Sequence, residues 1–142
     1  MACVSVCEAK AIDHSMTAVE ETLQRDPNLL DTLAEAYFVA GRPEDAIQPL
    51  RKAASLLKNS APLINVQLAQ VMLQTRKKSY NAEVINLLRR AIAMENDNPM
   101  AYNLLGQAYH NAGQLPESYL SRAQGLFYFG AIEDAQNFAR RA

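Results

Sequence analysis

Apolar residues recur along most of the chain at intervals of three, four and seven positions, the spacing that places side chains on one face of an α-helix. The pattern is clear from Leu30 to Tyr37 and again from Tyr102 to Tyr109. A similar stretch surrounds Leu68. Polar residues fill the positions in between. Each stretch therefore predicts an amphipathic helix that packs through one face.

Small residues stand at matching places in these helices. One directly follows the central leucine of each, at Ala34, Ala69 and Gly106. The helices predicted over 46–53 and 84–91 carry stripes in which bulky and small residues alternate. A small side chain lets a second helix approach closely, so we expect pairs of helices that pack through these positions. One pair alone buries too little apolar surface, so neighbouring pairs must stack.

Two turns are built from the same kinds of residue. They are "AYFVAGRPEDA", residues 36–46, and "AYHNAGQLPES", residues 108–118. In the first, Gly41 is free to adopt the left-handed conformation that ends a helix, and Pro43 presets the φ angle for the first turn of the next helix. The second stretch has a glycine and a proline in the same roles. Each stretch predicts a tight turn between two paired helices.

The glycines of these turns mark a repeat. Gly41 and Gly113 are 72 positions apart (113 minus 41), which is two periods of 34 residues plus four. One extra residue falls in 58–62 and three fall in 74–83, both predicted turns that tolerate insertions. The predicted organisation is an N-terminal arm over 1–17, poorly ordered or partly helical, and one domain over 18–142 with units of about 28–61, 62–98 and 99–131 and a terminal helix over 132–142.

The repeat resembles the tetratricopeptide repeat (TPR), whose pattern is W-x2-L-G-x2-Y followed by spaced alanines. The matching residues are Tyr102, Leu105, Gly106 and Tyr109. The departures from the pattern are Leu30, Asn65, Ser118, Arg122 and Gly125. The resemblance covers roughly residues 28–129. It implies an all-α, right-handed solenoid of about three helical hairpins with a flanking helix at each end, acting as a protein-interaction module.

Three stretches are similar to a more specific family: "AIQPLRKAASLL", "INLLRRAIAMENDNP" and "SRAQGLFYFGAIEDAQNFARRA". They resemble the C-terminal TPR region of bacterial periplasmic zinc metallopeptidases of the BepA type. This resemblance implies a periplasmic, non-catalytic region that presents clients or docks to outer-membrane assembly machinery. The alternatives are a stand-alone adaptor in the cytoplasm, or a scaffold that forms a homodimer through its terminal helix.

The chain has no catalytic constellation of its own. Its histidines are His14 and His110, so it lacks an H-E-x-x-H zinc helix, and we expect neither enzyme activity nor a cofactor. No nucleophile or second acid accompanies His110, which we expect to be a surface imidazole. Cys3, Cys7 and His14 offer only three ligands, so free thiols are expected there rather than a metal site.

Composition and charge narrow the classes of partner. The 142 residues are 49% hydrophobic and 20% charged with a net charge of −1, so no overall basic field attracts nucleic acid. Basic clusters at 51–52, 76–78 and 89–90 are expected to be solvated on the outer face. No apolar run reaches the roughly 18 residues that a membrane span needs. The start lacks the basic, apolar and small-residue order of an export signal, so we expect any such signal to lie outside this sequence or not to exist. The amphipathic pattern stops abruptly at the end, so we expect the natural polypeptide to continue.

The outward-facing residues on the first helix of each unit are the candidate binding site. The resemblance implies an extended peptide or a partner helix on this face. Amide side chains both donate and accept hydrogen bonds, so a row of them suits a peptide backbone; the alternative is a solvated face that happens to be rich in amides. The candidates are Asp31, Glu35, Phe38, Val66, Gln67, Gln70, Gln74, Asn103, Gln107, His110 and Asn111.

One specialised form of this site is not expected. TPR domains that clamp the C-terminal carboxylate of a chaperone use Lys, Arg and Asn on this face. The corresponding residues here are Asp31, Glu35, Gln67, Met100 and Leu104. Without cations, a free carboxylate gains no charge-assisted hydrogen bonds, and the two acidic residues would repel it.

Overall fold

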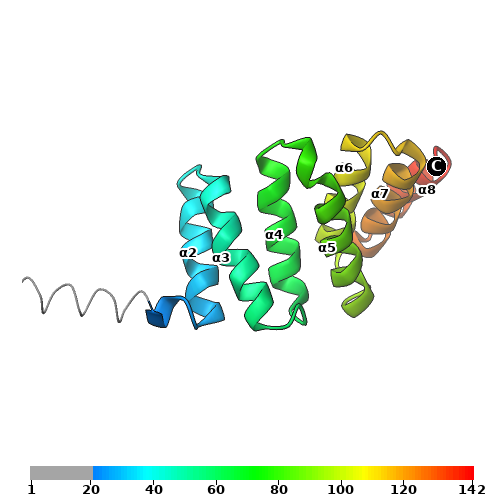
Figure 1. Cartoon of the computed structure of the whole chain (residues 1–142). Coiled ribbons are helices and arrows are strands. Elements are labelled where there is room, and N and C mark those ends of the chain that lie inside the picture. Colours follow the sequence, from blue (N-terminus) through cyan, green and yellow to red (C-terminus); the bar gives the residue numbers. More distant parts are fainter. Residues whose placement is uncertain (1–20) are drawn as a thin grey trace, which may run out of the picture.

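The structure, a computed structural model, describes residues 21–142, and every regular element in that range is helical. The elements are α2 (Pro27–Val39), α3 (Pro43–Leu56), α4 (Pro62–Gln74), the short 3-10 helix η1 (Lys78–Tyr80), α5 (Asn81–Met94), α6 (Pro99–Asn111), α7 (Leu115–Phe129) and α8 (Ile132–Ala139). Helix α2 pairs with α3, α4 with α5 and α6 with α7, and α8 packs on α7. Figure 1 shows them in chain order from α2 to α8. The predicted all-α solenoid of helical hairpins is confirmed.

Proline and side-chain caps fix where most of these helices begin. Helices α2, α3, α4, α6 and α7 each have a proline at the first or second position, where its missing N–H leaves no partner unsatisfied. Asp26 caps α2 by accepting a hydrogen bond from the Asn28 N–H at 2.9 Å. Asn98 caps α6 by accepting one from the Ala101 N–H at 3.2 Å.

Glycine ends the first helix of two hairpins. Gly41 has a φ of 73° and Gly113 a φ of 77°, both in the left-handed region, as predicted. The Arg42 N–H donates to the Tyr37 carbonyl at 2.9 Å, which closes the end of α2. Pro43 then begins α3. The sequence-based prediction of a tight turn between paired helices is therefore confirmed.

The extra residues of the repeat lie in turns. Between α4 and α5 the chain passes through Arg76, with a φ of 57°, and then through η1. Between α3 and α4, Lys58 and Asn59 have φ values of 51° and 57°. Left-handed conformations at residues other than glycine cost about 1–2 kcal/mol each. The packed helices on either side are left undisturbed by the added length.

One continuous apolar core runs through the stack. Its largest fully buried side chains include Leu50, Leu68, Met72, Val84 and Leu88, which come from the three central helices α3, α4 and α5. The same cluster continues into α2 and α6. Burying each such side chain contributes on the order of 1.5–3 kcal/mol. Each hairpin therefore depends on its neighbours for much of its stability.

Helices α6 and α7 approach each other closely at Gly106. A Cβ at that position would lie 2.7 Å from Arg122 Cγ and 3.1 Å from the Ser118 carbonyl oxygen. The buried Ser118 hydroxyl donates to the Gly106 carbonyl at 2.7 Å. The small residue predicted to permit close packing does so here, and the stem of Arg122 occupies the space that a side chain would fill.

The two ends of the chain differ in how much can be compared with the predictions. Helix α8 buries Ala135 against α7, and its Phe138 ring lies 6.2 Å from the ring of Tyr119. It ends at Ala139. The arm predicted over 1–17 lies outside the described residues. Of the helix predicted before Pro27, residues 21–23 are described and are helical.

Candidate binding groove

The first helices of the hairpins, α2, α4 and α6, form one face of the stack, which we call the groove face. A pocket of about 170 Å³ lies between α2 and α4 on this face. The predicted residues that line it are Asp31, Glu35, Phe38, Gln67 and Gln70. Its other lining residues are Ala34, Leu50 and Val71, which are apolar and buried. The structure thus brings side chains predicted on two separate helices into one site.

Two buried oxygen atoms in this pocket accept no hydrogen bond, Asp31 Oδ1 and Gln67 Oε1. Burial raises the pKa of the Asp31 carboxyl, and the Glu35 carboxylate raises it further, whereas the nearby side-chain amide of Gln67 lowers it in part. A buried acceptor left without a donor costs about 1–3 kcal/mol. The pocket is therefore suited to a group that brings N–H donors or positive charge.

Asp31→Asn is expected to raise the melting temperature at pH 7. The raised pKa means that the folded state disfavours the ionised carboxylate of Asp31. The ionised form therefore destabilises the protein at pH values above the folded-state pKa. Below the unfolded-state pKa of 3.8 the carboxyl is protonated in both states and this destabilisation is absent. The gain should therefore shrink in thermal melts as the pH falls from 7 towards 4. Asp97→Asn, at an exposed aspartate between α5 and α6, is the matched control. A gain that is equal at every pH would contradict this account.

A second pocket, of about 320 Å³, lies among α4, η1, α5 and α6. The predicted residues Gln107 and Asn111 line it, together with the three cations at 76–78. Lys77 Nζ lies 2.7 Å from Glu44 Oε1, and this partner raises the pKa of Lys77. The ion pair is exposed and contributes little to stability. This pocket is polar and accessible to water.

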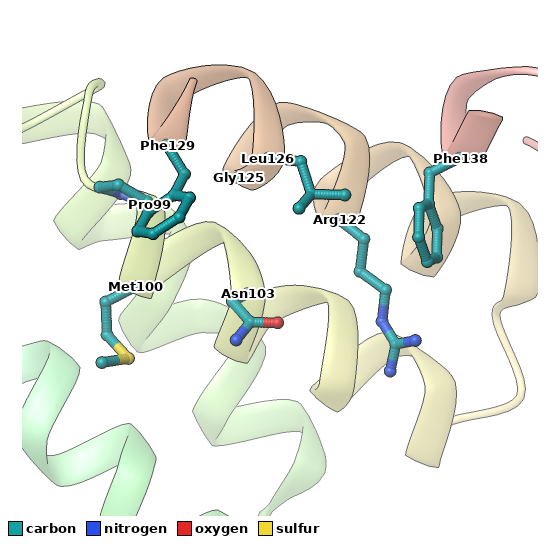
Figure 2. Close-up of a pocket in the computed structure, with 8 residues that line it drawn as sticks. All are labelled: Pro99, Met100, Asn103, Arg122, Gly125, Leu126, Phe129 and Phe138. Atoms are coloured by element: carbon teal, nitrogen blue, oxygen red, sulfur yellow. The ribbon is translucent and has the colours of Figure 1, made fainter. Parts of the chain in front are cut away.

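A third pocket, of about 500 Å³, lies among α6, α7 and α8 and is shown in Figure 2. Asn103 is the predicted residue in it. Its other lining residues are Pro99, Met100, Arg122, Gly125, Leu126, Phe129 and Phe138. The sequence contained a signal for this site, because Arg122 and Gly125 both depart from the repeat pattern. The departures alone do not indicate a pocket, since its walls come from three helices.

Two residues assigned to the groove face belong to the core instead. Val66 is 4% exposed, so the prediction that it faces outward is wrong. Leu104, assigned to a carboxylate-clamp position, is 8% exposed. Helix α4 packs against α3 and α5 and also contacts α6, which leaves little of its circumference open to solvent. Gln74 and His110 are exposed, but neither lines any of these three pockets.

Several basic residues are paired within the stack. The guanidinium of Arg51 on α3 donates to the Glu83 carboxylate on α5, through Nε to Oε1 at 3.2 Å and through Nη2 to Oε2 at 2.7 Å. Lys52 Nζ donates to Gln24 Oε1 at 2.6 Å. Both residues of the basic cluster at 51–52 thus form hydrogen bonds to other parts of the chain.

Residues 21–142 contain neither a candidate membrane span nor a candidate metal site. In that part of the chain no helix is long and apolar enough to cross a membrane. The same residues hold no group of three or more His, Cys, Asp or Glu side chains placed to bind a metal ion. The predictions for Cys3, Cys7 and His14 lie outside the described residues.

Known proteins support the fold. Residues 87–119 match the family model of the tetratricopeptide repeat. The first TPR of Spaghetti (RPAP3), solved with the HSP90 peptide SRMEEVD, superimposes with a TM-score of 0.69 at 20% identity, covering 82% of this chain and 90% of that one. This chain has the tetratricopeptide repeat fold.

Other solved structures also superimpose on this chain. The first TPR domain of human RPAP3 gives a TM-score of 0.67 at 20% identity, over 82% of this chain and 89% of that one. MamA from Desulfovibrio magneticus RS-1 gives 0.66 at 20% identity, over 82% and 72%. No curated protein matches the sequence. The comparisons support the TPR family that the sequence resembles, and they do not show the BepA-type resemblance.

Proposed function

We propose that the chain is a protein-interaction module that binds an extended peptide on its groove face. The observation that carries this proposal is the pocket between α2 and α4, in which Asp31, Gln67 and Gln70 lie beside buried apolar residues. An extended backbone presents N–H donors at regular intervals and can donate to the oxygen atoms of these side chains. Recognition of this kind depends on the peptide backbone more than on its side chains.

The rest of the groove face supports the same proposal. Asn103 and Gln107 are exposed amides on α6, and each lines one of the other two pockets. Candidate binding positions therefore recur along this face from α2 to α6. The RPAP3 repeat with the same fold was solved with a bound peptide. Asp31 and Glu35 still argue against a clamp for a C-terminal carboxylate at the α2–α4 end, and that expectation stays a prediction.

Replacing the two exposed amides together tests the groove. Twelve-residue peptides are first selected on the wild-type protein from a random displayed library. Asn103→Ala combined with Gln107→Ala should then weaken their binding about tenfold, since each lost hydrogen bond is worth roughly 0.5–1.5 kcal/mol. Fluorescence anisotropy measures the affinity. The melting temperature should not change, because both side chains are exposed.

The matched control removes the same two side-chain types from the outer helices. Gln48→Ala on α3 combined with Asn86→Ala on α5 should leave peptide affinity unchanged, since both residues are exposed away from the groove face. If no peptide is selected, or if both double variants bind equally well, the groove face is not the binding site.

For the kind of protein to which this module belongs, we propose two alternatives. In the first, the module is the C-terminal region of a periplasmic zinc metallopeptidase, on the strength of the stretches on α3, α5 and α7–α8 that are similar to the BepA-type family. In the second, it is a stand-alone adaptor in the cytoplasm, or a self-associating scaffold, unconnected with proteolysis. A module unconnected with proteolysis is the better supported of the two, because two of the matched structures are described as TPR domains of RPAP3 and none of those reported above as a metallopeptidase. An H-E-x-x-H motif and an export signal in frame upstream of residue 1 would select the first.

A further inference from the structure

The pocket in Figure 2, which we call the Arg122 pocket, has mostly apolar walls. Met100, Leu126, Phe129 and Phe138 line it, and Phe129 is 77% exposed. Covering apolar surface of this kind is favourable in proportion to the area removed from water. The pocket volume of about 500 Å³ lies within the range of ordinary ligand sites and has room for a large side chain with its flanking backbone.

Arg122 is held in a defined direction at this pocket. Its stem lies against Gly106, where a Cβ would come within 2.7 Å of Arg122 Cγ. Its guanidinium carbon lies 6.0 Å from the centre of the Phe138 ring. Figure 2 shows the two side chains extending from α7 and α8 toward the same space. Glycine on one side and an aromatic ring on the other thus position the charge.

The charge of Arg122 has no acidic partner among residues 21–142, whose ion pairs lie elsewhere. Its Nε atom is buried and donates no hydrogen bond. A buried charged donor without an acceptor is costly, and a carboxylate forms charge-assisted hydrogen bonds with a guanidinium that are stronger than neutral ones. An anionic oxygen that accepts hydrogen bonds from the Arg122 guanidinium is therefore the polar group that best complements this apolar pocket.

The other end of the groove face has the opposite charge. Asp31 and Glu35 line the α2–α4 pocket and would repel a carboxylate. The cations at 76–78 lie between the two ends, but Lys77 is exposed and already paired with Glu44, so its attraction for a peptide is screened by water and salt. An acidic side chain of a bound peptide is thus repelled from the α2–α4 end and attracted to the Arg122 end, where the Arg141 guanidinium carbon also lies 5.8 Å from the centre of the Phe138 ring.

Side chains two residues apart in an extended peptide point to the same side, about 6.5–7 Å from each other. This separation is close to the 6.0 Å between the Arg122 guanidinium and the Phe138 ring. We propose that the Arg122 pocket binds an internal, extended partner segment that carries Leu, Met or Phe two residues from Asp or Glu. The inference rests on the proposed peptide-binding function and adds a residue pattern to it.

Parallel selections test this pattern. A random library of 12-residue peptides, flanked at both ends by constant linkers, is selected on the wild-type protein and on Arg122→Gln. We expect the apolar-x-acidic pattern to be enriched on the wild type only. A capped synthetic peptide with the pattern should bind Arg122→Gln about tenfold more weakly, as expected for the loss of a charge-assisted pair. Its counterpart with Gln in place of Glu should bind both proteins equally weakly.

Three further variants separate charge, wall and position. Arg122→Lys keeps the charge and should recover part of the affinity. Phe138→Ala keeps the arginine but removes one wall and the ring that positions the charge. It should weaken the same peptide, which keeps the test informative if Arg122→Gln folds poorly. Arg90→Gln, which removes an exposed arginine from the outer helix α5, is the matched control and should bind normally. If Arg90→Gln weakens binding as much as Arg122→Gln does, the proposed pocket is wrong.

The remaining outcomes distinguish this inference from the function on which it rests. Selected peptides that lack an acidic residue would overturn the inference and leave the peptide-binding function standing, whereas the absence of any selected peptide would overturn both. Synthetic peptides that bind only with a free C-terminus would replace the internal segment by a terminal carboxylate. A dimer by light scattering that Arg122→Gln dissociates would show that a second copy occupies the pocket.

Discussion

Leu68→Ala is expected to lower the free energy of unfolding by about 2–5 kcal/mol, the usual cost of removing a large side chain from a packed core. Leu68 is 2% exposed and lies on α4, which packs against both α3 and α5. The alanine leaves a cavity at the centre of the stack, where the neighbouring helices are held on both sides and collapse only partly. Chemical denaturation followed by circular dichroism measures the loss.

Leu63→Ala is the matched control for this prediction. It makes the same chemical change on the same helix, but Leu63 is 61% exposed. Surface substitutions of this kind usually alter stability by no more than about 0.5 kcal/mol. Equal losses for the two variants would show that α4 does not face the core through Leu68.

Gly106→Val is expected to destabilise the protein by about 1–3 kcal/mol through overpacking, even though valine is the better helix former. The new Cβ would lie 2.7 Å from Arg122 Cγ and 3.1 Å from the Ser118 carbonyl oxygen, and the second of these atoms belongs to the backbone of α7. The hairpin must therefore open to admit it. Thermal and denaturant unfolding measure the effect.

The neighbouring residue supplies the control, since Gln107→Val places the same side chain on the exposed side of α6. It should change stability by no more than about 0.5 kcal/mol. Combining Gly106→Val with Arg122→Ala should restore part of the loss, because one of the two contacts is removed and the other stays. No recovery in the double variant would place the whole strain in the backbone contact.

The fold was predictable because its local and long-range requirements agree. The helix period, the glycine at position 41 and the proline that follows it each indicate a hairpin, and the structure shows all three in that role. Gly106 shows the same agreement for packing, since a small residue in the pattern marks a close approach of helices. In a repeat protein most contacts join elements near in sequence, so local patterns carry most of the architecture.

The candidate site was less predictable, for physical reasons. Periodicity places residues on the faces of a helix but does not say how many faces are covered. The helical pattern alone predicts an outward side chain at Val66. The structure buries this side chain because α4 is in contact with α3, α5 and α6. The Arg122 pocket requires the position of α8 relative to α6 and α7, and no pattern within a single helix contains that information. Asp31 and Gln67, predicted from two separate helices, both line the α2–α4 pocket, and their role in binding stays a prediction.

The Arg51–Glu83 pair joins the outer helices of adjacent hairpins, α3 and α5. The principal contacts connect each hairpin only to the next one. A small rotation between two hairpins therefore changes the curvature of the whole stack. The pair lies on the outer side of the junction between the first and second hairpins. Rotation at this junction changes the distance between the α2–α4 pocket and the Arg122 pocket, and the pair opposes that rotation by connecting the two outer helices.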